Sequence, residues 1–166
     1  MERKKQMHCP VCMMDTNEVS IADTYADMKF TFCSEQCKER FTANPSLYVS
    51  QAGKTAVKHY IKNIIKQRTL DLEETIPADI ANTISQSLMT MMGINEVQIK
   101  GNKINITYNL LEATTQQIEA HIEQMGQHLS RSWIDRLKRA FIHYKEETEL
   151  DNLEQSDGHS CHNPPK

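Results

Sequence analysis

Residues 32–41 read FCSEQCKERF, and their two cysteines complete a four-cysteine pattern that begins near the start of the chain. Cys33 and Cys37 follow Cys9 and Cys12, so the spacing is C-x2-C, a gap of twenty residues, and C-x3-C. Four thiolates spaced in this way suit tetrahedral zinc. We therefore predict that the four cysteines ligate one metal ion.

The residues around the second pair predict a helix that starts immediately after Cys33. Ser34 is a typical N-cap residue, whose hydroxyl accepts a hydrogen bond from an amide two or three residues later. Cys37 then lies one turn into the helix, where its thiolate can share an ion with Cys33, and Phe41 follows on the same face. Pro45 is expected to begin another short turn.

The segment between the two pairs predicts a hairpin. Residues 19–25 and 29–32 have the pattern of short strands joined by a turn at Ala26-Asp27, with Phe30 and Phe32 on one face. Such a hairpin would carry the second cysteine pair back to the first.

CPVC at residues 9–12, followed by YADMKFTFCSEQCKERFTANPSLYV at residues 25–49, resembles the YHS/TRASH family of small treble-clef-like metal-binding modules. The resemblance covers residues 8 to about 50, and it implies a role with copper, mercury or other heavy metals. His8, Met13 and Met14 would add soft or borderline donors beside the site. The family usually carries Gly-Met after its first CxxC, whereas this chain has Met13-Met14, which predicts an altered loop.

The four-cysteine pattern leaves the role of the ion open. Closed four-cysteine zinc sites are usually structural, whereas the family resemblance implies a sensed or transported metal. Cys9-Pro10-Val11-Cys12 is also similar to the thiol-oxidoreductase motif, but that chemistry needs a cysteine at a helix N-terminus after a strand. No strand is expected before Cys9 and the second pair explains both thiols better, so a redox enzyme is disfavoured.

Residues 54–67, KTAVKHYIKNIIKQ, predict an amphipathic linker helix within residues 51–68, because their apolar residues recur at helical spacing. Lysines recur every four residues on the other side, and we interpret them as a solvated face in preference to a docking surface for acidic partners or phosphate. These lysines are Lys54, Lys58, Lys62 and Lys66.

The pattern of residues 69–130 predicts strand, helix, strand, strand and helix, which is a ferredoxin-like split βαβ unit. The overall fold class is therefore α+β: a treble-clef-like zinc module at residues 1–50, the linker helix, the ferredoxin-like domain and a long C-terminal helix. The residues expected to start or end the elements of the second domain are Pro77, Gly93, the Gly101-Asn102 turn and Thr114 or Thr115.

PADIANTISQSLMTMMGINEVQIKGNKINITYN at residues 77–109, with IEAHIEQMG at residues 118–126, is similar to the heavy-metal-associated (HMA) family of metallochaperones and metal-pump heads. That family binds Cu(I) through a CxxC between its first strand and first helix, and residues 74–79 of this chain contain no cysteine. We therefore predict that this domain binds no copper or zinc and keeps the fold as a docking or dimerisation module.

No fourth strand is predicted for this domain. Residues 131–154 instead predict a long amphipathic helix from about Ser132, because apolar side chains recur at helical spacing. Its apolar stripe is expected to pack on the sheet or on the linker helix, with a membrane-surface or partner-binding role as the alternative. The stripe consists of Trp133, Leu137, Ala140, Phe141 and Tyr144.

The last residues, 155–166, are polar and end in Asn163-Pro164-Pro165-Lys166. His159, Cys161 and His162 offer one thiolate and two imidazoles, which could form a second metal site. In a mobile tail such a site would suit capture and transfer of metal.

Composition narrows the functional class. The 166 residues are 39% hydrophobic and 25% charged, with a net charge of −3 that disfavours nucleic acid as a partner. No run approaches the roughly 20 apolar residues that span a bilayer, and MERKKQMH precedes cysteines instead of a signal-peptide core, so a cytoplasmic location is expected.

These observations together predict a non-enzymatic metal-binding protein whose cofactor is zinc, copper or another soft metal ion. A metal transporter or another protein is a candidate partner, and the oligomeric state is left open. The alternative is an interaction adaptor with a purely structural zinc, and a nucleic-acid-binding zinc finger is less favoured.

Overall fold

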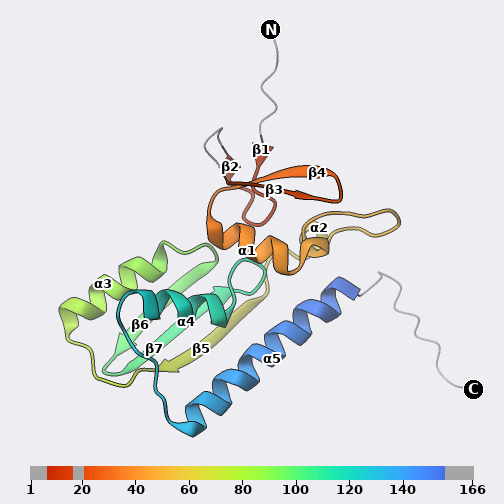
Figure 1. Ribbon diagram of the computed structural model, residues 1–166. Helices are drawn as coiled ribbons and strands as arrows, with labels where there is room; N and C mark the ends of the chain where they lie inside the picture. Colours follow the sequence, from red (N-terminus) through yellow and green to blue (C-terminus); the bar gives the residue numbers. More distant parts are fainter. Residues whose placement is uncertain (1–6, 17–20, 156–166) are drawn as a thin grey trace, which may run out of the picture.

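The computed structural model describes residues 7–16 and 21–155. The N-terminal part consists of two short antiparallel hairpins, one helix and one 3₁₀ turn (Figure 1). The elements are β1 (Met7–His8), β2 (Asp15–Thr16), β3 (Ile21–Tyr25), β4 (Met28–Phe32), α1 (Glu35–Ala43) and η1 (Pro45–Leu47).

The predicted hairpin between the two cysteine pairs is confirmed for the described residues, since β3 pairs with β4 from Ile21↔Phe32 to Tyr25↔Met28. Ala26 and Asp27 join the strands with φ of 49° and 61°. Two consecutive positive φ values are the signature of a type I′ turn, whose twist matches that of the paired strands.

The prediction of a linker helix was wrong over most of its length. Helix α2 spans only Val57–Tyr60, and the chain is already extended in β5 (Ile65–Asp71). The distant Asn109 explains this difference, because its side chain accepts a hydrogen bond from the amide of Ile64 at 2.9 Å. Strand pairing with a partner far along the chain thus overrides the local helical pattern.

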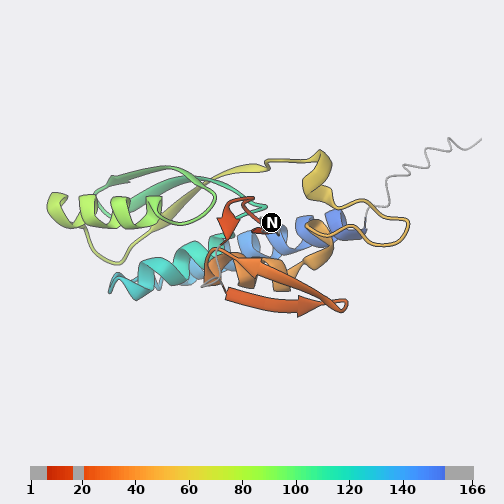
Figure 2. The ribbon, with the colours of Figure 1, turned by 90° about the horizontal axis from the view of Figure 1, so that it is seen from above.

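The second half of the chain is a two-layer unit in which a three-stranded antiparallel sheet has the order β5-β7-β6. The inward-facing side chains of β7, which are Ile104, Ile106 and Tyr108, are buried, whereas the opposite face of the sheet is polar. Helices cover the buried face (Figures 1 and 2). The remaining elements are α3 (Ala78–Met89), β6 (Ile94–Lys100), β7 (Lys103–Asn109), α4 (Thr115–Gln124) and α5 (Trp133–Gln155).

A trace of a fourth strand lies where a split βαβ unit would have one. Leu72 and Leu129 form an isolated antiparallel bridge beside β5. The amide of Ser130 donates to the carbonyl of Asp71 at 2.8 Å, and the amide of Glu73 donates to that of His128 at 2.9 Å. The order of the four segments is therefore that of a ferredoxin-like fold, with the last strand reduced to a bridge.

Helix α5 begins where the pattern predicts, but it docks through a different face. Trp133, Leu137, Phe141 and Tyr144 are exposed, and the buried residues of the helix are Glu146 and Leu150. The expectation that the apolar stripe packs inward was therefore wrong. Among the described helices, none combines the length and the hydrophobicity that a membrane span requires.

A buried carboxylate holds α5 in this orientation. Glu146 accepts hydrogen bonds from the amide of Thr115 at 2.9 Å, from the hydroxyl of Thr115 at 2.7 Å and from the hydroxyl of Tyr108. A buried charged acceptor with several donors is costly to expose or to leave unpaired. This polar network outweighs the apolar pattern on the other side of the helix.

Candidate metal centre

The first cysteine pair lies in a tight knuckle between β1 and β2. The amide of Cys9 donates to the carbonyl of Met14 at 2.8 Å, and the amide of Met13 donates to the carbonyl of Cys9 at 2.9 Å. Met13 has a φ of 64°, a left-handed conformation that glycine adopts without strain. The knuckle therefore forms with methionine in a strained position, and an alteration of the loop relative to the family stays a prediction.

The second pair is positioned by the start of α1. Ser34 caps the helix, because its hydroxyl accepts from the amide of Cys37 at 3.2 Å, as predicted. Cys33 precedes the cap and Cys37 lies in the first turn, so both thiols reach the same side. Phe41 follows one turn later and is 2% exposed.

An aromatic cluster closes this side of the module. The ring of Phe41 lies 5.0 Å from that of Phe30, 5.1 Å from that of Phe32 and 6.0 Å from that of Tyr48. These rings join the strands of the hairpin to α1, and they fix the direction in which the helix presents Cys37.

The sulfur atoms of all four predicted ligands converge. They lie within 4.8 Å of one another, with 3.3 Å between Cys12 and Cys33 and 3.6 Å between Cys33 and Cys37. Tetrahedral zinc with Zn–S bonds of about 2.3 Å requires sulfur–sulfur distances of about 3.8 Å. The donor set and its spacing therefore fit one tetrahedral ion, and four sulfurs also suit a softer metal such as Cu(I).

The thiols perturb one another's protonation. Hydrogen bonds from the thiols of Cys12 and Cys37 hold the pKa of Cys9 far below that of an ordinary thiol. The pKa of Cys37 is raised well above its usual range, because it donates to Cys12 and Cys9 and because it is buried. The thiols therefore do not ionise independently, and because metal ligation requires thiolates, a cation that binds here must displace protons.

The four cysteines differ in exposure. Cys9 and Cys37 are fully buried, whereas Cys12 and Cys33 are partly exposed. Met13 and Met14, which follow Cys12 in the sequence, are 62% and 50% exposed. One edge of the sulfur cluster therefore faces solvent, and two thioethers lie next to that edge in the sequence.

Other donors considered from the sequence do not join the cluster. His8 directs Nδ1 to Asp15, at 2.7 Å from Oδ1. His159, Cys161 and His162 lie outside the described residues, so their role as a second site stays a prediction. The prediction that residues 68–130 bind no copper or zinc also stays a prediction.

Side chains of the N-terminal module bond directly to the second unit, a feature that sequence reasoning missed. The amide group of Gln36 donates to the carbonyls of Met92 at 2.8 Å and Glu112 at 3.1 Å, and it accepts from the amide of Met92 at 3.0 Å. The hydroxyl of Tyr48 donates to the carbonyl of Leu111 at 2.6 Å. Because these partners are backbone groups, no residue type in the sequence marks them.

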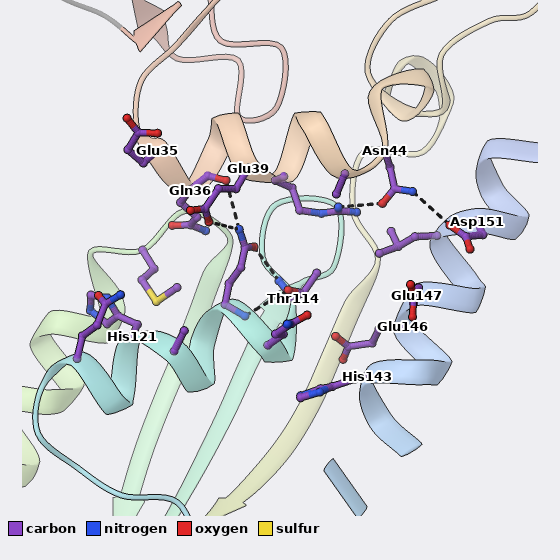
Figure 3. Close-up of a pocket in the computed structure, with 18 of the residues that line it drawn as sticks. Glu35, Gln36, Glu39, Asn44, Thr114, His121, His143, Glu146, Glu147 and Asp151 are labelled. Atoms are coloured by element: carbon purple, nitrogen blue, oxygen red, sulfur yellow. Dashed lines mark hydrogen bonds between the residues drawn. The ribbon is translucent and has the colours of Figure 1, made fainter. Parts of the chain in front are cut away.

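A polar cleft of about 760 Å³ lies between α1, α4 and α5 (Figure 3). Figure 3 shows Gln36 and Glu39 of α1 close to Thr114 at the start of α4, and Asn44 directed to Asp151 of α5. Its carboxylates include Glu35, Glu39, Glu146, Glu147 and Asp151. The cleft marks the seam between the two parts of the molecule and lies apart from the four sulfurs.

Comparison with known proteins gives one family match, which lies in the N-terminal module. Residues 7–52 match the family model of the YHS domain, which confirms the first resemblance. No match was found among curated protein sequences.

Three solved structures resemble about 40% of the chain at a TM-score of 0.38. The CsoZ metallochaperone is 19% identical and is covered over 99% of its length. Oxidized MerP from Ralstonia metallidurans CH34 is 13% identical and is covered over 96%. The N-terminal soluble domains of Bacillus subtilis CopA are 23% identical and are covered over 47%. At such scores and identities the likeness carries no inference about function.

Proposed function

We propose that the protein binds one soft metal ion, Zn²⁺ or Cu(I), through Cys9, Cys12, Cys33 and Cys37 and acts in the handling of that metal. The observation that carries this proposal is the convergence of four thiols within 4.8 Å at separations close to those of a tetrahedral sulfur site. The match of residues 7–52 to the YHS domain supports a metal-binding role for the same residues.

The exposure of the site favours an ion that exchanges over one that is permanently enclosed. Cys12 and Cys33 are reachable from solvent, so a competing thiolate or a partner's ligand can approach the metal from that edge. Met13 and Met14 would assist a soft ion there, because thioethers bind Cu(I) but hold Zn²⁺ poorly.

The rest of the chain has a non-catalytic part in this proposal. The split βαβ unit, which has no cysteine in residues 74–79, serves as a docking module for a protein such as a metal transporter. His159, Cys161 and His162 assist capture and transfer of the ion. The thiols must stay reduced to bind metal, which suits the cytoplasm.

The test is elemental analysis of full-length protein purified without added metal, followed by transfer of the ion to a chromogenic chelator. We expect one ion per chain and transfer within minutes, with the same stoichiometry in Cys161→Ser but slower transfer. A chain that carries one zinc and retains it for days against excess chelator would instead support the adaptor with a structural zinc. A chain that carries no metal, and takes up none, would refute the proposed site.

A further inference from the structure

The exposed apolar stripe of α5 is a surface feature that the proposed metal chemistry does not use. Trp133, Leu137, Phe141 and Tyr144 are 73%, 63%, 56% and 64% exposed. Their spacing of four, four and three residues places them on one face of the helix, over a length of about 16 Å. Figure 1 shows this first part of α5 at the periphery of the molecule, away from the N-terminal hairpins.

The docking of α5 points this stripe outward. Glu146 and Leu150 face the interior, and Arg139 lies near Glu119 of α4 with an Nε–Oε2 distance of 3.8 Å. These residues occupy the side of the helix opposite to Leu137 and Tyr144. No described residue can therefore cover the stripe while α5 remains docked.

Cations flank the stripe on both sides. Residues 131–145 contain five basic residues and one acidic residue, Asp135. Arg136 and Lys138 are the immediate neighbours of Leu137 and project to either side of the stripe, and Lys138 also pairs with Asp135 at 3.3 Å. Lys145 lies 4.5 Å from the centre of the Phe141 ring, which keeps its charge at the edge of the apolar surface.

We propose that this face of α5 binds the surface of an anionic lipid bilayer, with the helix lying in the plane of the interface. An apolar stripe with aromatic residues at its ends and basic residues along its rim is the arrangement by which interfacial helices insert and attract anionic lipid. Trp133 and Tyr144 suit this position, because their rings are apolar and their N–H and O–H groups remain hydrated. A second copy of the chain is disfavoured, because pairing of two such faces would oppose cation to cation.

Trp133 makes the test direct, because it is the single tryptophan of the chain. Full-length protein is titrated with vesicles of phosphatidylcholine alone and with vesicles in which about a third of the lipid is phosphatidylglycerol. We expect red-shifted emission without vesicles, a blue shift with anionic vesicles, and partitioning to neutral vesicles weaker by about tenfold or more. Co-sedimentation with the vesicles checks that the shift reports binding.

Two variants, together with one control variant, separate the apolar and the charged contributions to binding. Leu137→Glu should abolish the blue shift, whereas Ile80→Glu, which makes the same change at an exposed position of α3, should leave it intact. Arg136→Gln combined with Lys145→Gln should weaken binding to anionic vesicles toward the level of neutral ones. All three keep the buried face of α5 unchanged.

Unchanged emission with both kinds of vesicle would overturn the proposal and leave an acidic protein as the occupant to seek. A blue shift that grows with protein concentration in the absence of lipid, together with a doubled mass, would also overturn it in favour of self-association. Equal binding to neutral and anionic vesicles would refute the role of the cations.

Discussion

The N-terminal module, which matches the YHS domain over residues 7–52, and the larger split βαβ unit are stabilised by different means. In the module β1 and β2 have only two residues each, and two cysteines belong to its buried core alongside Phe32, Phe41 and Leu47. In the second unit a continuous set of aliphatic side chains fills the space between sheet and helices. The comparison indicates that a metal ion supplies to the first part what apolar burial supplies to the second.

The two parts nevertheless share one core. Tyr48 and Gln36 connect the N-terminal module to residues 92 and 111–112, and a single cluster of buried residues runs from Cys9 to Leu150. We therefore expect the loss of metal to unfold the module and to weaken the seam, while the sheet of the second unit stays paired.

Of the changes proposed here, replacement of one predicted metal ligand should have the largest effect on the difference in stability between the two parts. In Cys37→Ser we expect loss of the ion and unfolding of residues 21–50, because the binding free energy of a metal in a small module is also folding free energy. Hydrogen exchange should become fast in α1 and remain slow in β5, β7 and α4. Elemental analysis gives the metal content of the same sample.

Cys161→Ser is the matched control, since it makes the same chemical change outside the four-sulfur cluster and should keep one ion. Full metal content and unchanged protection of α1 in Cys37→Ser would show that the module does not depend on its ion.

The buried carboxylate of Glu146 in α5 should make the next largest contribution, which is to the stability of the second unit. Glu146→Gln replaces one of the two acceptor oxygens with an NH₂ group, so the donors of Thr115 and Tyr108 can no longer all be satisfied, which should cost about 2–4 kcal/mol. Urea unfolding of the metal-loaded protein measures this cost. Glu147→Gln, at the exposed neighbouring position, should change stability by less than about 0.5 kcal/mol. Equal effects of the two substitutions would show that Glu146 does not hold the helix.

Substitution of Gly93 tests how closely its turn packs against Glu112 and Ala113. Its φ is 82°, and a Cβ there would lie 2.7 Å from Cβ of Glu112 and 3.2 Å from the amide nitrogen of Ala113. Gly93→Ala should therefore cost about 2–3 kcal/mol, from backbone strain and from a clash that the backbone must relieve.

Gly101→Ala separates these two contributions, because Gly101 has a φ of 62° but open space around it. We expect a loss of only about 1 kcal/mol there, from strain alone. Similar losses at both glycines, measured by urea unfolding, would mean that the contact with Glu112 relaxes freely.

Local signals in the sequence predicted most elements that frame the site. The spacing of the cysteines, the cap at Ser34, the Gly101-Asn102 turn and the cap at Thr114 each act within a few residues, and each is present in the structure. The convergence of the four thiols followed from the same local rules, because a hairpin and a helix start leave few ways to arrange them.

Long-range partners decided the features that the sequence did not predict. Residues 61–67 do not continue the helix, because Asn109 and β7, which lie forty or more residues further along the chain, pair with this segment. The apolar stripe of α5 faces outward because Glu146, on the opposite side of the helix, accepts hydrogen bonds from Thr115 and Tyr108 in the interior. Periodicity within one segment carries no information about such partners, so it could not predict either outcome.

The smallest predicted effect concerns the knuckle itself. Met13 holds a φ of 64° where the YHS/TRASH resemblance expects glycine, so Met13→Gly should relieve backbone strain in the metal-bound state. Glycine also gains entropy in the unfolded chain, which offsets part of the benefit, and a net gain of about 0.5–1 kcal/mol remains. This gain corresponds to metal binding that is tighter by about two- to fivefold, measured by competition with a chelator of known affinity.

Met14→Gly is the control, because Met14 has no positive φ, and it should give no such gain. An equal increase in zinc affinity in both variants would show that crowding by the side chains, and not the backbone of Met13, limits the site. If Met13→Gly alone lowers the affinity for Cu(I) while it raises the affinity for Zn²⁺, the exposed thioether contributes to the binding of the softer ion.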